Sequence, residues 1–262
     1  MKKEGYAPVI LIPVKLPVVQ RGENLRPIIF RALDDNHVKL RHRDVLAVAS
    51  KVVSVAENRT VELDKTRISS RARRLAGKYQ LDARLAQVVL NEADDVCGGV
   101  HGFILTIRQG MLSANAGVDV KNSPAGNAIL WPALPNYSAS VIRKYLELKA
   151  HVRLGVIIVD SRVTPLRLGT TGLTIGLSGF QPIQDERGRY DLYHRRVRVT
   201  QTNVVDDLAA AAHLLMGECD ERIGVVVIRN ARINLGRFSS SQAKLSMKKC
   251  LVGSSLVNFA KV

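Results

Sequence analysis

The sequence is poor in cysteine, in aromatic residues and in long apolar runs, and each shortage excludes a class of protein. Its three cysteines, Cys97, Cys219 and Cys250, are too few and too scattered for a disulfide framework or a paired-cysteine metal site. Aromatic residues make up 5% of the chain and do not alternate with the basic clusters, as a base-stacking surface requires. No stretch of about 18 apolar residues occurs, so we expect no transmembrane helix and no membrane partner. The sparse cysteines fit a reducing, cytoplasmic location.

Several signatures of nucleotide binding and catalysis are also missing. The chain has no GxxxxGK[ST] loop, no GxGxxG loop after a strand, no HExxH pair and no GxSxG nucleophile, and its six histidines show no metal spacing. The glycine-rich runs at 98–102 and 172–179 are more typical of turns and strands than of phosphate-binding loops. An apolar run follows the N-terminal lysines, but Pro13 and Lys15 interrupt it and no small-residue cleavage site follows, so we expect no signal peptide.

Acidic residues are absent from the range 229–262, and the chain as a whole carries a net charge of +16 with a pI of about 10.2. A second basic cluster lies at 65–78. This balance favours an anionic partner, which could be nucleic acid, an acidic membrane surface or a phosphorylated small molecule. The alternative is a solvated basic face. We expect Lys51, Arg162 and Arg167 to line a cleft for phosphorylated substrates and the C-terminal basic residues to form a solvated surface.

Apolar spacing predicts a mixed α and β fold. Short valine-rich or β-like runs predict strands at 9–19, 44–55, 103–107, 111–114, 152–160, 168–179, 195–200 and 223–228. Helical spacing predicts helices at 23–33, at 66–93 with a break near Gly77, from a cap at Ser138 to about residue 148, and at 202–216. These elements alternate without a uniform βαβ period or an internal repeat.

The length allows one large domain or two modest ones. We expect a main α/β domain at 1–161 and 199–228, because strands and helices alternate there. The irregular basic stretch at 162–198 is expected to be a smaller inserted β-rich lobe, and 229–262 a basic C-terminal tail.

Two aspartates lie where predicted strands end. Asp160 directly follows a buried apolar run, and Asp119 lies with Asn122 in the polar loop after a predicted hairpin. A carboxylate at a strand end is held by rigid backbone, and with nearby oxygen donors such as Ser161 and Gln201 it suits Mg²⁺ or Mn²⁺. Taken alone, each aspartate is more typical of a cap or a turn. The metal hypothesis therefore requires the two carboxylates to lie within bridging distance.

Five segments in a consistent order resemble one known family. They are DVLAVASKVVS at 44–54, SANAGVD-x-x-N at 113–122, SAS-x-x-R at 138–143, VIIVDS-x-x-x-PLR-x-G at 156–169 and DDLA-x-AAHLLMGE at 206–218. Together they resemble the coenzyme F420-0:L-glutamate ligase family from about residue 9 to residue 227. Several motifs in one order are far more specific than any single one.

The resemblance implies a GTP-dependent ligase that joins L-glutamate to the lactyl carboxylate of the deazaflavin F420-0, with further γ-linked glutamates as an extension. It implies an α+β fold, a two-lobed scaffold of mixed sheets and helices, and an intertwined homodimer with GTP bound where the subunits meet. Two divalent ions, Mg²⁺ or Mn²⁺, are the implied cofactors, with K⁺ as an optional further ion. The implied partners are GTP, L-glutamate and F420-0 or a related anionic carboxylate, and not nucleic acid.

The resemblance also implies roles for individual residues. Asp119 and Asp160 correspond to ligands of one ion, and Ser161 and Gln201 to ligands of the other. Arg167 is expected to act with the two aspartates in catalysis. The positions expected to contact the nucleotide are Leu16, Pro17, Val18, Val19, Ser50, Lys51 and Asn122.

Three departures from the family pattern lie on the substrate side. Arg162-Val163-Thr164 stands where the family usually has Phe-Gly-Arg, Val55 where it has lysine, and Gln109 where it has histidine. Two alternatives therefore stay open beside the F420-0 ligase. One is a related nucleotide-dependent amide ligase with a different carboxylate acceptor, and the other is a non-catalytic homologue that binds a nucleotide or RNA.

Overall fold

The computed structural model describes residues 7–259, with side chains described to residue 255. The chain forms two compact units. Unit 1 comprises Met1–Ala56, Pro132–Ser161 and Thr171–Ala243, and unit 2 comprises Glu57–Trp131, Arg162–Thr170 and Lys244–Val262. Residues 1–6, on which the signal-peptide prediction partly falls, and Lys261 of the basic tail lie outside the described residues.

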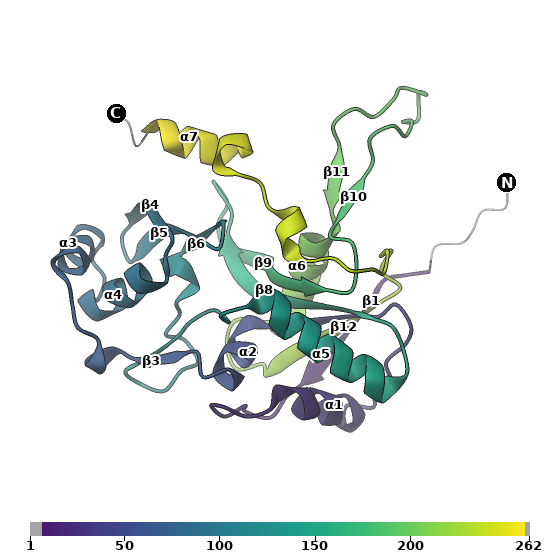
Figure 1. Ribbon diagram of the computed structural model, residues 1–262, viewed down its shortest axis with the longest axis horizontal. Helices are drawn as coiled ribbons and strands as arrows, with labels where there is room; N and C mark the ends of the chain where they lie inside the picture. Colours follow the sequence, from purple (N-terminus) through teal and green to yellow (C-terminus); the bar gives the residue numbers. More distant parts are fainter. Residues whose placement is uncertain (1–6, 260–262) are drawn as a thin grey trace. The chain divides into compact units, whose positions relative to one another are not determined.

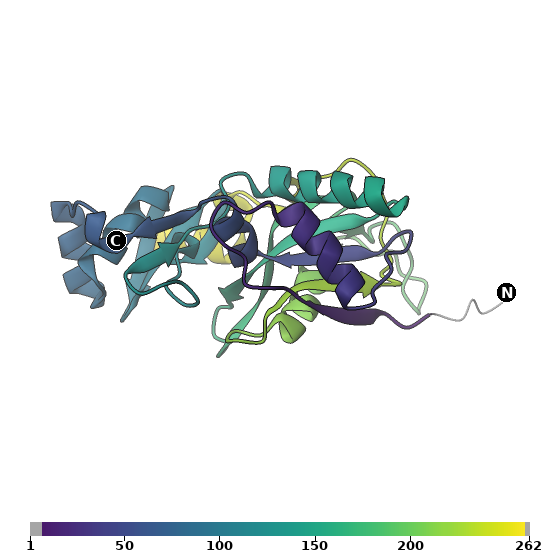
Figure 2. The ribbon, with the colours of Figure 1, turned by 90° about the horizontal axis from the view of Figure 1, so that it is seen from below.

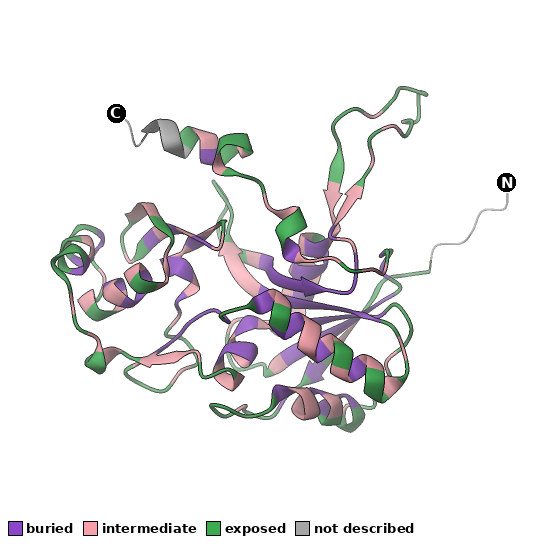
Figure 3. Cartoon of the chain, viewed as in Figure 1, coloured by how far each residue is buried: buried purple, intermediate pink, exposed green. Residues whose placement is uncertain are grey.

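Unit 1 contains a five-stranded sheet with the strand order β1-β12-β2-β8-β9 (Figure 1). Its strands are β1 (Ile10–Lys15), β2 (Val45–Ala49), β8 (Gly155–Val163), β9 (Thr170–Ser178) and β12 (Ile223–Arg229). Strand β12 runs antiparallel to both of its neighbours, whereas β2 and β8 are parallel. Strands β2 and β12 are buried along most of their length (Figure 3), because both consist mainly of branched apolar residues and are covered on both faces.

Helices cover both faces of this sheet (Figure 2). The helices of unit 1 are α1 (Leu25–Asp35), α2 (Ser50–Ala56), α5 (Pro135–Ala150), α6 (Val204–Met216) and the 3₁₀ turn η3 (Ser240–Ala243). Helix α6 buries Val205 and Ala212 in one core cluster with residues of β2, β8 and β12. On the opposite face α1 and α5 pack together, and the rings of Phe30 and Tyr145 meet edge-on with centroids 6.4 Å apart. No helix within residues 7–259 has the length and apolar character needed to cross a bilayer.

The apolar run at 44–55 divides into two elements instead of forming one strand. Strand β2 ends at Ala49, and helix α2 begins at the next residue, Ser50. A continuous apolar run does not reveal its own period, so a strand followed by a buried helix looks the same as a longer strand. The consequence is that Ser50 and Lys51 lie at a turn from strand to helix at the carboxyl end of β2.

The glycines of the run at 172–179 allow a close approach between layers. Strand β9 passes so near to α6 that a Cβ atom on Gly172 would lie 2.2 Å from the carbonyl oxygen of Ala209. This confirms the prediction that the run is strand glycine, and it explains why a side chain is missing there.

Strands β10 (Ile183–Asp185) and β11 (Gln201–Asn203) form an antiparallel pair whose connection extends far from the sheet of unit 1 (Figure 1). The predicted strand at 195–200 is wrong, since only an isolated bridge between Tyr190 and Arg196 forms in this connection. Its basic residues instead make short-range ion pairs. These join Arg187 to Asp185, Arg189 to Glu186, and Arg195 to Asp191.

Unit 2 has its own small core and two small sheets. Its strands are β3 (Thr60–Glu62), β4 (Asp95–Val100), β5 (Phe103–Arg108), β6 (Met111–Ala114) and β7 (Asn127–Ile129). Its α-helices are α3 (Ser70–Tyr79), α4 (Ala83–Glu92) and α7 (Leu251–Phe259). Its 3₁₀ turns are η1 (Leu63–Lys65), η2 (Asn115–Gly117) and η4 (Met247–Lys249). Strands β4, β5 and β6 form an antiparallel sheet, and β3 pairs with β7. The core lies between α3, α4 and these strands, and includes Ala72, Val89 and Ile104.

Two local predictions need correction. The break between α3 and α4 lies at Gln80, which adopts a positive φ of 51°, and not at Gly77, which lies inside α3. Helix α5 begins at Pro135, so Ser138 is not its cap; the Ser138 hydroxyl donates to the Leu134 carbonyl 3.2 Å away. The predicted hairpin at 103–107 and 111–114 is confirmed, but the strand β4 that pairs with it was not predicted.

The two units divide the chain differently from the expected domains. The expected inserted lobe at 162–198 is split, because 162–170 belongs to unit 2 and β9 is the edge strand of the sheet in unit 1. Residues 57–131, expected in the main domain, form most of unit 2. The prediction of a mixed α and β fold is confirmed.

The expected solvated tail begins inside the core of unit 1. Arg229 ends β12, and its guanidinium donates to both carboxylate oxygens of Asp44 at 3.0 and 2.9 Å and to the Lys39 carbonyl at 2.8 Å. Asp44 is only 1% exposed, and its carboxylate raises the pKa of Arg229. Ala231 and Ile233 are buried as well. Arg229 lies in a stretch without acidic residues, so the sequence gives no sign that it pairs with a carboxylate. Its partner, Asp44, lies far away in the chain.

We expect Arg229→Leu to destabilise unit 1 by about 3–5 kcal/mol, because the substitution leaves the buried Asp44 carboxylate without its counter-charge. Urea unfolding followed by far-ultraviolet circular dichroism measures this loss. The control is Arg237→Leu, which removes an exposed arginine eight positions further on and is expected to change stability by no more than about 0.5 kcal/mol. Equal effects of the two substitutions would contradict a buried ion pair.

Candidate functional site

The central contact of the site in unit 1 lies where the parallel pairing of β2 with β8 ends. Ala49 of β2 is in register with Val159 of β8, so the residues that follow them, Ser50 and Asp160, lie side by side. The Ser50 hydroxyl donates a hydrogen bond to Oδ1 of Asp160 with an oxygen–oxygen distance of 2.7 Å. Ser50 is 4% exposed and Asp160 is half-buried, so the carboxylate is anchored from the protein side. Asp160 lies within β8, directly after the last residue paired with β2, and the strand continues to Val163, so the predicted strand end at residue 160 is wrong.

The other predicted residues near the contact of Ser50 with Asp160 differ in their exposure. Lys51 follows Ser50 in α2 and is half-buried, and Ser161 follows Asp160 in β8 and is half-buried.

The predicted nucleotide segment is residues 16–19. Leu16 is buried and packs against Gly224, whereas Pro17 and Val18 are exposed and Val19 is half-buried. The Leu16 side chain therefore belongs to the core, and only its backbone remains as a candidate for contact with a ligand.

Gln201 is positioned by a polar junction between β11 and α6. Asn203 precedes the helix, its amide oxygen accepts from the Asp206 backbone nitrogen at 3.3 Å, and its amide nitrogen donates to Oδ2 of Asp206 at 2.9 Å. The other carboxylate oxygen of Asp206 accepts from the Thr174 backbone nitrogen at 3.0 Å. Gln201 is exposed two residues before this junction, so its amide is available at the surface of unit 1.

In unit 2, Asp119 follows an unusual backbone turn. Asn115, Ala116 and Gly117 have consecutive positive φ values of 50°, 52° and 70°. The Asn115 side chain accepts from the Ile104 backbone nitrogen at 2.8 Å. After the turn, the backbone of Asp119 exchanges two hydrogen bonds with Ile129, at 3.0 and 2.7 Å. The turn and this bridge together fix the backbone position of Asp119.

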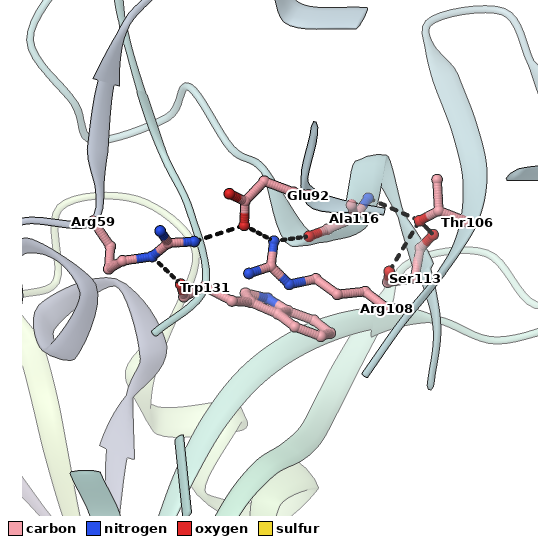
Figure 4. Close-up of polar contacts among 7 residues, drawn as sticks. All are labelled: Arg59, Glu92, Thr106, Arg108, Ser113, Ala116 and Trp131. Atoms are coloured by element: carbon pink, nitrogen blue, oxygen red, sulfur yellow. Dashed lines mark hydrogen bonds and ion pairs between the residues drawn. The ribbon is translucent and has the colours of Figure 1, made fainter. Parts of the chain in front are cut away.

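Buried polar groups hold this turn in place (Figure 4). The Ala116 backbone nitrogen donates to the Thr106 hydroxyl at 2.9 Å, and its carbonyl accepts from Arg108 at 3.3 Å. Arg108 also pairs with Glu92, which accepts from Arg59 at 2.6 Å. Burial lowers the pKa of Arg108, while Glu92 opposes that shift. Since both arginines share one carboxylate, the network attaches the turn to α4 and β3.

The single tryptophan of the chain completes this arrangement. The Arg108 guanidinium lies 5.6 Å from the centroid of the Trp131 ring, a cation–π distance, and the Trp131 carbonyl accepts from Arg59 Nε at 3.0 Å. The indole lies so close to Gly117 that a Cβ atom there would be 2.1 Å from Nε1. Gly117 is therefore required both by its positive φ and by the position of the ring.

The remaining predicted residues of unit 2 lie in exposed turns. Asn122 has a positive φ of 57° and follows Asp119, whose Oδ1 accepts from the Lys121 backbone nitrogen at 2.8 Å. Arg167 is exposed in the turn between β8 and β9, and its backbone nitrogen donates to the Thr164 carbonyl at 3.1 Å. Asp119 belongs to unit 2 and Asp160 to unit 1. That they hold the same ion stays a prediction, as does the cleft of Lys51, Arg162 and Arg167.

The donor chemistry of these residues fits a hard divalent ion. Within residues 7–259 no group of three or more histidine, cysteine, aspartate or glutamate side chains gathers as a metal cluster. The candidate ligands are two carboxylates, one hydroxyl and one amide, and all of them offer oxygen. Such a set suits Mg²⁺ or Mn²⁺ bound together with phosphate oxygens, and it does not suit zinc, which prefers nitrogen and sulfur.

Sequence reasoning missed the residues that support the two aspartates. The segment Ser113–Gly117 was used only as a family motif, although the pair Asn115 and Gly117 around a small residue is itself a signal for positive φ. Arg59, Glu92 and Trp131 carried no local signal, because their partners lie far away in the sequence.

The fold and the candidate ligands together define a mixed α and β protein with an anchored carboxylate where two parallel strands cease to pair, and oxygen donors of this kind suit a divalent ion bound together with phosphate. The family model F420-0:Gamma-glutamyl ligase matches residues 13–230, and the chain belongs to this family. The resemblance noted in the sequence is therefore confirmed.

Three relatives show how far the similarity extends. The coenzyme F420:L-glutamate ligase of Methanopyrus kandleri is 39% identical over 237 residues, which cover 89% of this chain and 92% of the relative. The protein of the same name from Methanocaldococcus jannaschii is 36% identical over 231 residues, covering 87% and 90%. The one from Archaeoglobus fulgidus is 33% identical over 248 residues, covering 93% and 98%. The similarity thus includes both units.

We expect Gly117→Ala to destabilise unit 2 by about 2–4 kcal/mol, because the new methyl group overlaps the indole and the residue needs a positive φ. The fluorescence of Trp131, the only tryptophan, reports unfolding of unit 2 in urea. The matched control is Gly77→Ala within α3, where nothing lies within 4 Å of the new Cβ. That substitution is expected to stabilise by about 0.5–1 kcal/mol. Changes of the same sign would contradict the proposed role of Gly117.

Proposed function

We propose that this protein is a GTP-dependent ligase that forms an amide bond between the amine of L-glutamate and the lactyl carboxylate of F420-0. The observation that carries the proposal is family membership across residues 13–230, together with relatives named coenzyme F420:L-glutamate ligase that match over most of both chains. The candidate site adds carboxylate, hydroxyl and amide oxygen donors, which suit ion-assisted phosphoryl transfer.

The chemistry explains why a nucleotide is needed. A free carboxylate does not react with an amine at neutral pH, because its oxygen is a poor leaving group. A carboxylate oxygen of F420-0 attacks the γ-phosphorus of GTP, the bond to the β-phosphate oxygen breaks, and an acyl phosphate and GDP form. The glutamate amine then attacks the acyl carbon, inorganic phosphate leaves, and the amine proton is released to give the amide. This route needs no protein nucleophile.

The roles of the chain's residues follow from the charges in this route. Asp119, Asp160, Ser161 and Gln201 would hold two divalent ions, which when bound neutralise the charge of the triphosphate. Lys51 and Arg167 supply further positive charge for a phosphate or a carboxylate. The backbone at 16–19 and Asn122 contact the nucleotide in this proposal. The expected homodimer and the binding of GTP where subunits meet belong to the same proposal.

The carboxylate acceptor is the part of this proposal for which the sequence offers an alternative. Arg162, Val163 and Thr164 replace the usual family residues beside Asp160, and the turn that follows them exposes Leu166 and Leu168 almost completely. This changed and exposed segment beside Asp160 is the reason why a related ligase with a different carboxylate acceptor is the second candidate. The experiment therefore compares F420-0 with other anionic carboxylates of similar size.

The direct test incubates the protein with GTP, Mn²⁺, L-glutamate and F420-0. Mass spectrometry is expected to show the glutamate adduct, and chromatography one GDP and one phosphate for each amide formed. Formation of the amide with ATP alone would contradict GTP dependence. If F420-0 is inert but another carboxylate is converted, the related-ligase alternative is correct. Salt-sensitive micromolar binding of arbitrary RNA without any ligation would favour the nucleic-acid alternative.

We expect Asp160→Asn to abolish ligation while leaving the protein folded. The substitution keeps side-chain volume but removes the charge that a hard dication requires, so the rate should fall about a thousandfold or more. Val156 to Val159 supply the buried contacts of β8 and are unchanged. Thermal unfolding and glutamate addition are measured on the same sample.

Asp34→Asn is the control for this substitution, because Asp34 is an exposed aspartate near the end of α1, away from β8. It is expected to keep full activity. An Asp160→Asn protein that ligates at the normal rate but melts at a lower temperature would show that Asp160 is only a turn residue.

A further inference from the structure

The hydrogen bond between Ser50 and Asp160 indicates a role for Ser50 that differs from contact with a nucleotide. The Ser50 hydroxyl lies 2.7 Å from Oδ1 of Asp160, and the serine is 4% exposed. Ser50 and Asp160 directly follow Ala49 and Val159, the last pair in the parallel register of β2 with β8. The contact is therefore held by the sheet and does not depend on a flexible loop.

A serine hydroxyl has one proton to donate. A carboxylate oxygen and a phosphate oxygen are both acceptors, so the hydroxyl that donates to Asp160 has no second proton for a nucleotide phosphate. A bond to one oxygen of a carboxylate restricts rotation of the carboxylate plane and thereby orients its lone pairs. Partners of metal ligands act in this way, and losing one typically lowers metal affinity or activity by about 10–100-fold.

We propose that Ser50 is a positioning residue that orients the Asp160 carboxylate for a divalent ion and does not bind the nucleotide through its side chain. This inference rests on the proposed function, in which Asp160 is a metal ligand. It explains why a small polar residue occupies a buried position at the start of α2. It also assigns the junction between β2 and α2 a part in metal binding.

Helix α2 contains a matched control one turn further on. Ser54 is 1% exposed, and its hydroxyl has no hydrogen-bond partner within the described part of the chain. Ser50→Ala and Ser54→Ala thus remove the same atom from two buried positions of one helix. Only the first removes a bond to Asp160, so a general effect on α2 would appear in both variants.

The test measures Mn²⁺ affinity by electron paramagnetic resonance of the free ion, with GTP present and without F420-0 or glutamate. Ser50→Ala is expected to weaken Mn²⁺ binding about 10–100-fold, whereas Ser54→Ala leaves it unchanged. At saturating Mn²⁺ the KM for GTP should stay close to the wild-type value while kcat falls. Ser50→Thr keeps the hydroxyl and is expected to restore most of the Mn²⁺ affinity.

A double substitution separates this inference from the proposed function. In the Asp160→Asn background, Ser50→Ala is expected to cause no further loss of Mn²⁺ affinity, because the serine acts only through the aspartate. If Asp160→Asn itself binds Mn²⁺ normally, the proposed metal site is wrong. If Asp160→Asn loses Mn²⁺ but Ser50→Ala binds it like the wild type, the metal site stands and the role of Ser50 is overturned. A raised KM for GTP with unchanged Mn²⁺ affinity would likewise overturn it, in favour of nucleotide contact.

Discussion

The parallel pairing of β2 with β8 is the constraint on which the candidate site of unit 1 depends. Five successive residue pairs, from Val45 with Gly155 to Ala49 with Val159, fix the two strands in register at the centre of the sheet. Strand β2 ends at Ala49 while β8 continues to Val163, and Ser50 and Asp160 lie side by side because they directly follow the last pair in this register. A shift of one residue would turn the following side chains to the other face, so the core that buries these strands also determines where the carboxylate of Asp160 lies.

The second aspartate is placed by a different physical means. Asp119 follows three residues with positive φ, a conformation that costs energy for a residue with a side chain such as Ala116. The Ala116 backbone nitrogen donates to the Thr106 hydroxyl and its carbonyl accepts from Arg108, and these bonds, the ion pair of Arg108 with Glu92 and the Trp131 indole compensate for that cost. A buried network of this kind stabilises only when all its members are present, which makes it an effective way to hold one backbone geometry.

Much of the fold could be predicted from the sequence, because apolar periodicity marks elements whose burial is regular. The helix over 204–216 and the strand over 223–229 lie close to where spacing predicts them. The run at 44–55 could not be divided, since an unbroken apolar stretch looks alike in a strand and in a buried helix. Arg229 was assigned to a solvated tail because its partner Asp44 lies far away in the chain.

The sequence alone indicates only part of the candidate site. A polar residue after an apolar strand is visible in the sequence, and Asp160 was identified in this way. Ser50 is expected only as a nucleotide contact, through the resemblance, and its bond to Asp160 could not be predicted because strand register is a property of the folded sheet. Family membership then supports roles for these residues, whereas the structure adds how Ser50 and Asp160 are held together.

We propose that Asp119 and Asp160 bind one divalent ion. Crystals grown with Mn²⁺ and a non-hydrolysable GTP analogue test it most directly, because anomalous scattering locates manganese without reference to the protein coordinates. We expect an anomalous peak within bonding distance of a carboxylate oxygen of each aspartate and of a phosphate oxygen of the analogue. Manganese bonded to neither aspartate, or carboxylates on opposite faces of the protein, would contradict it.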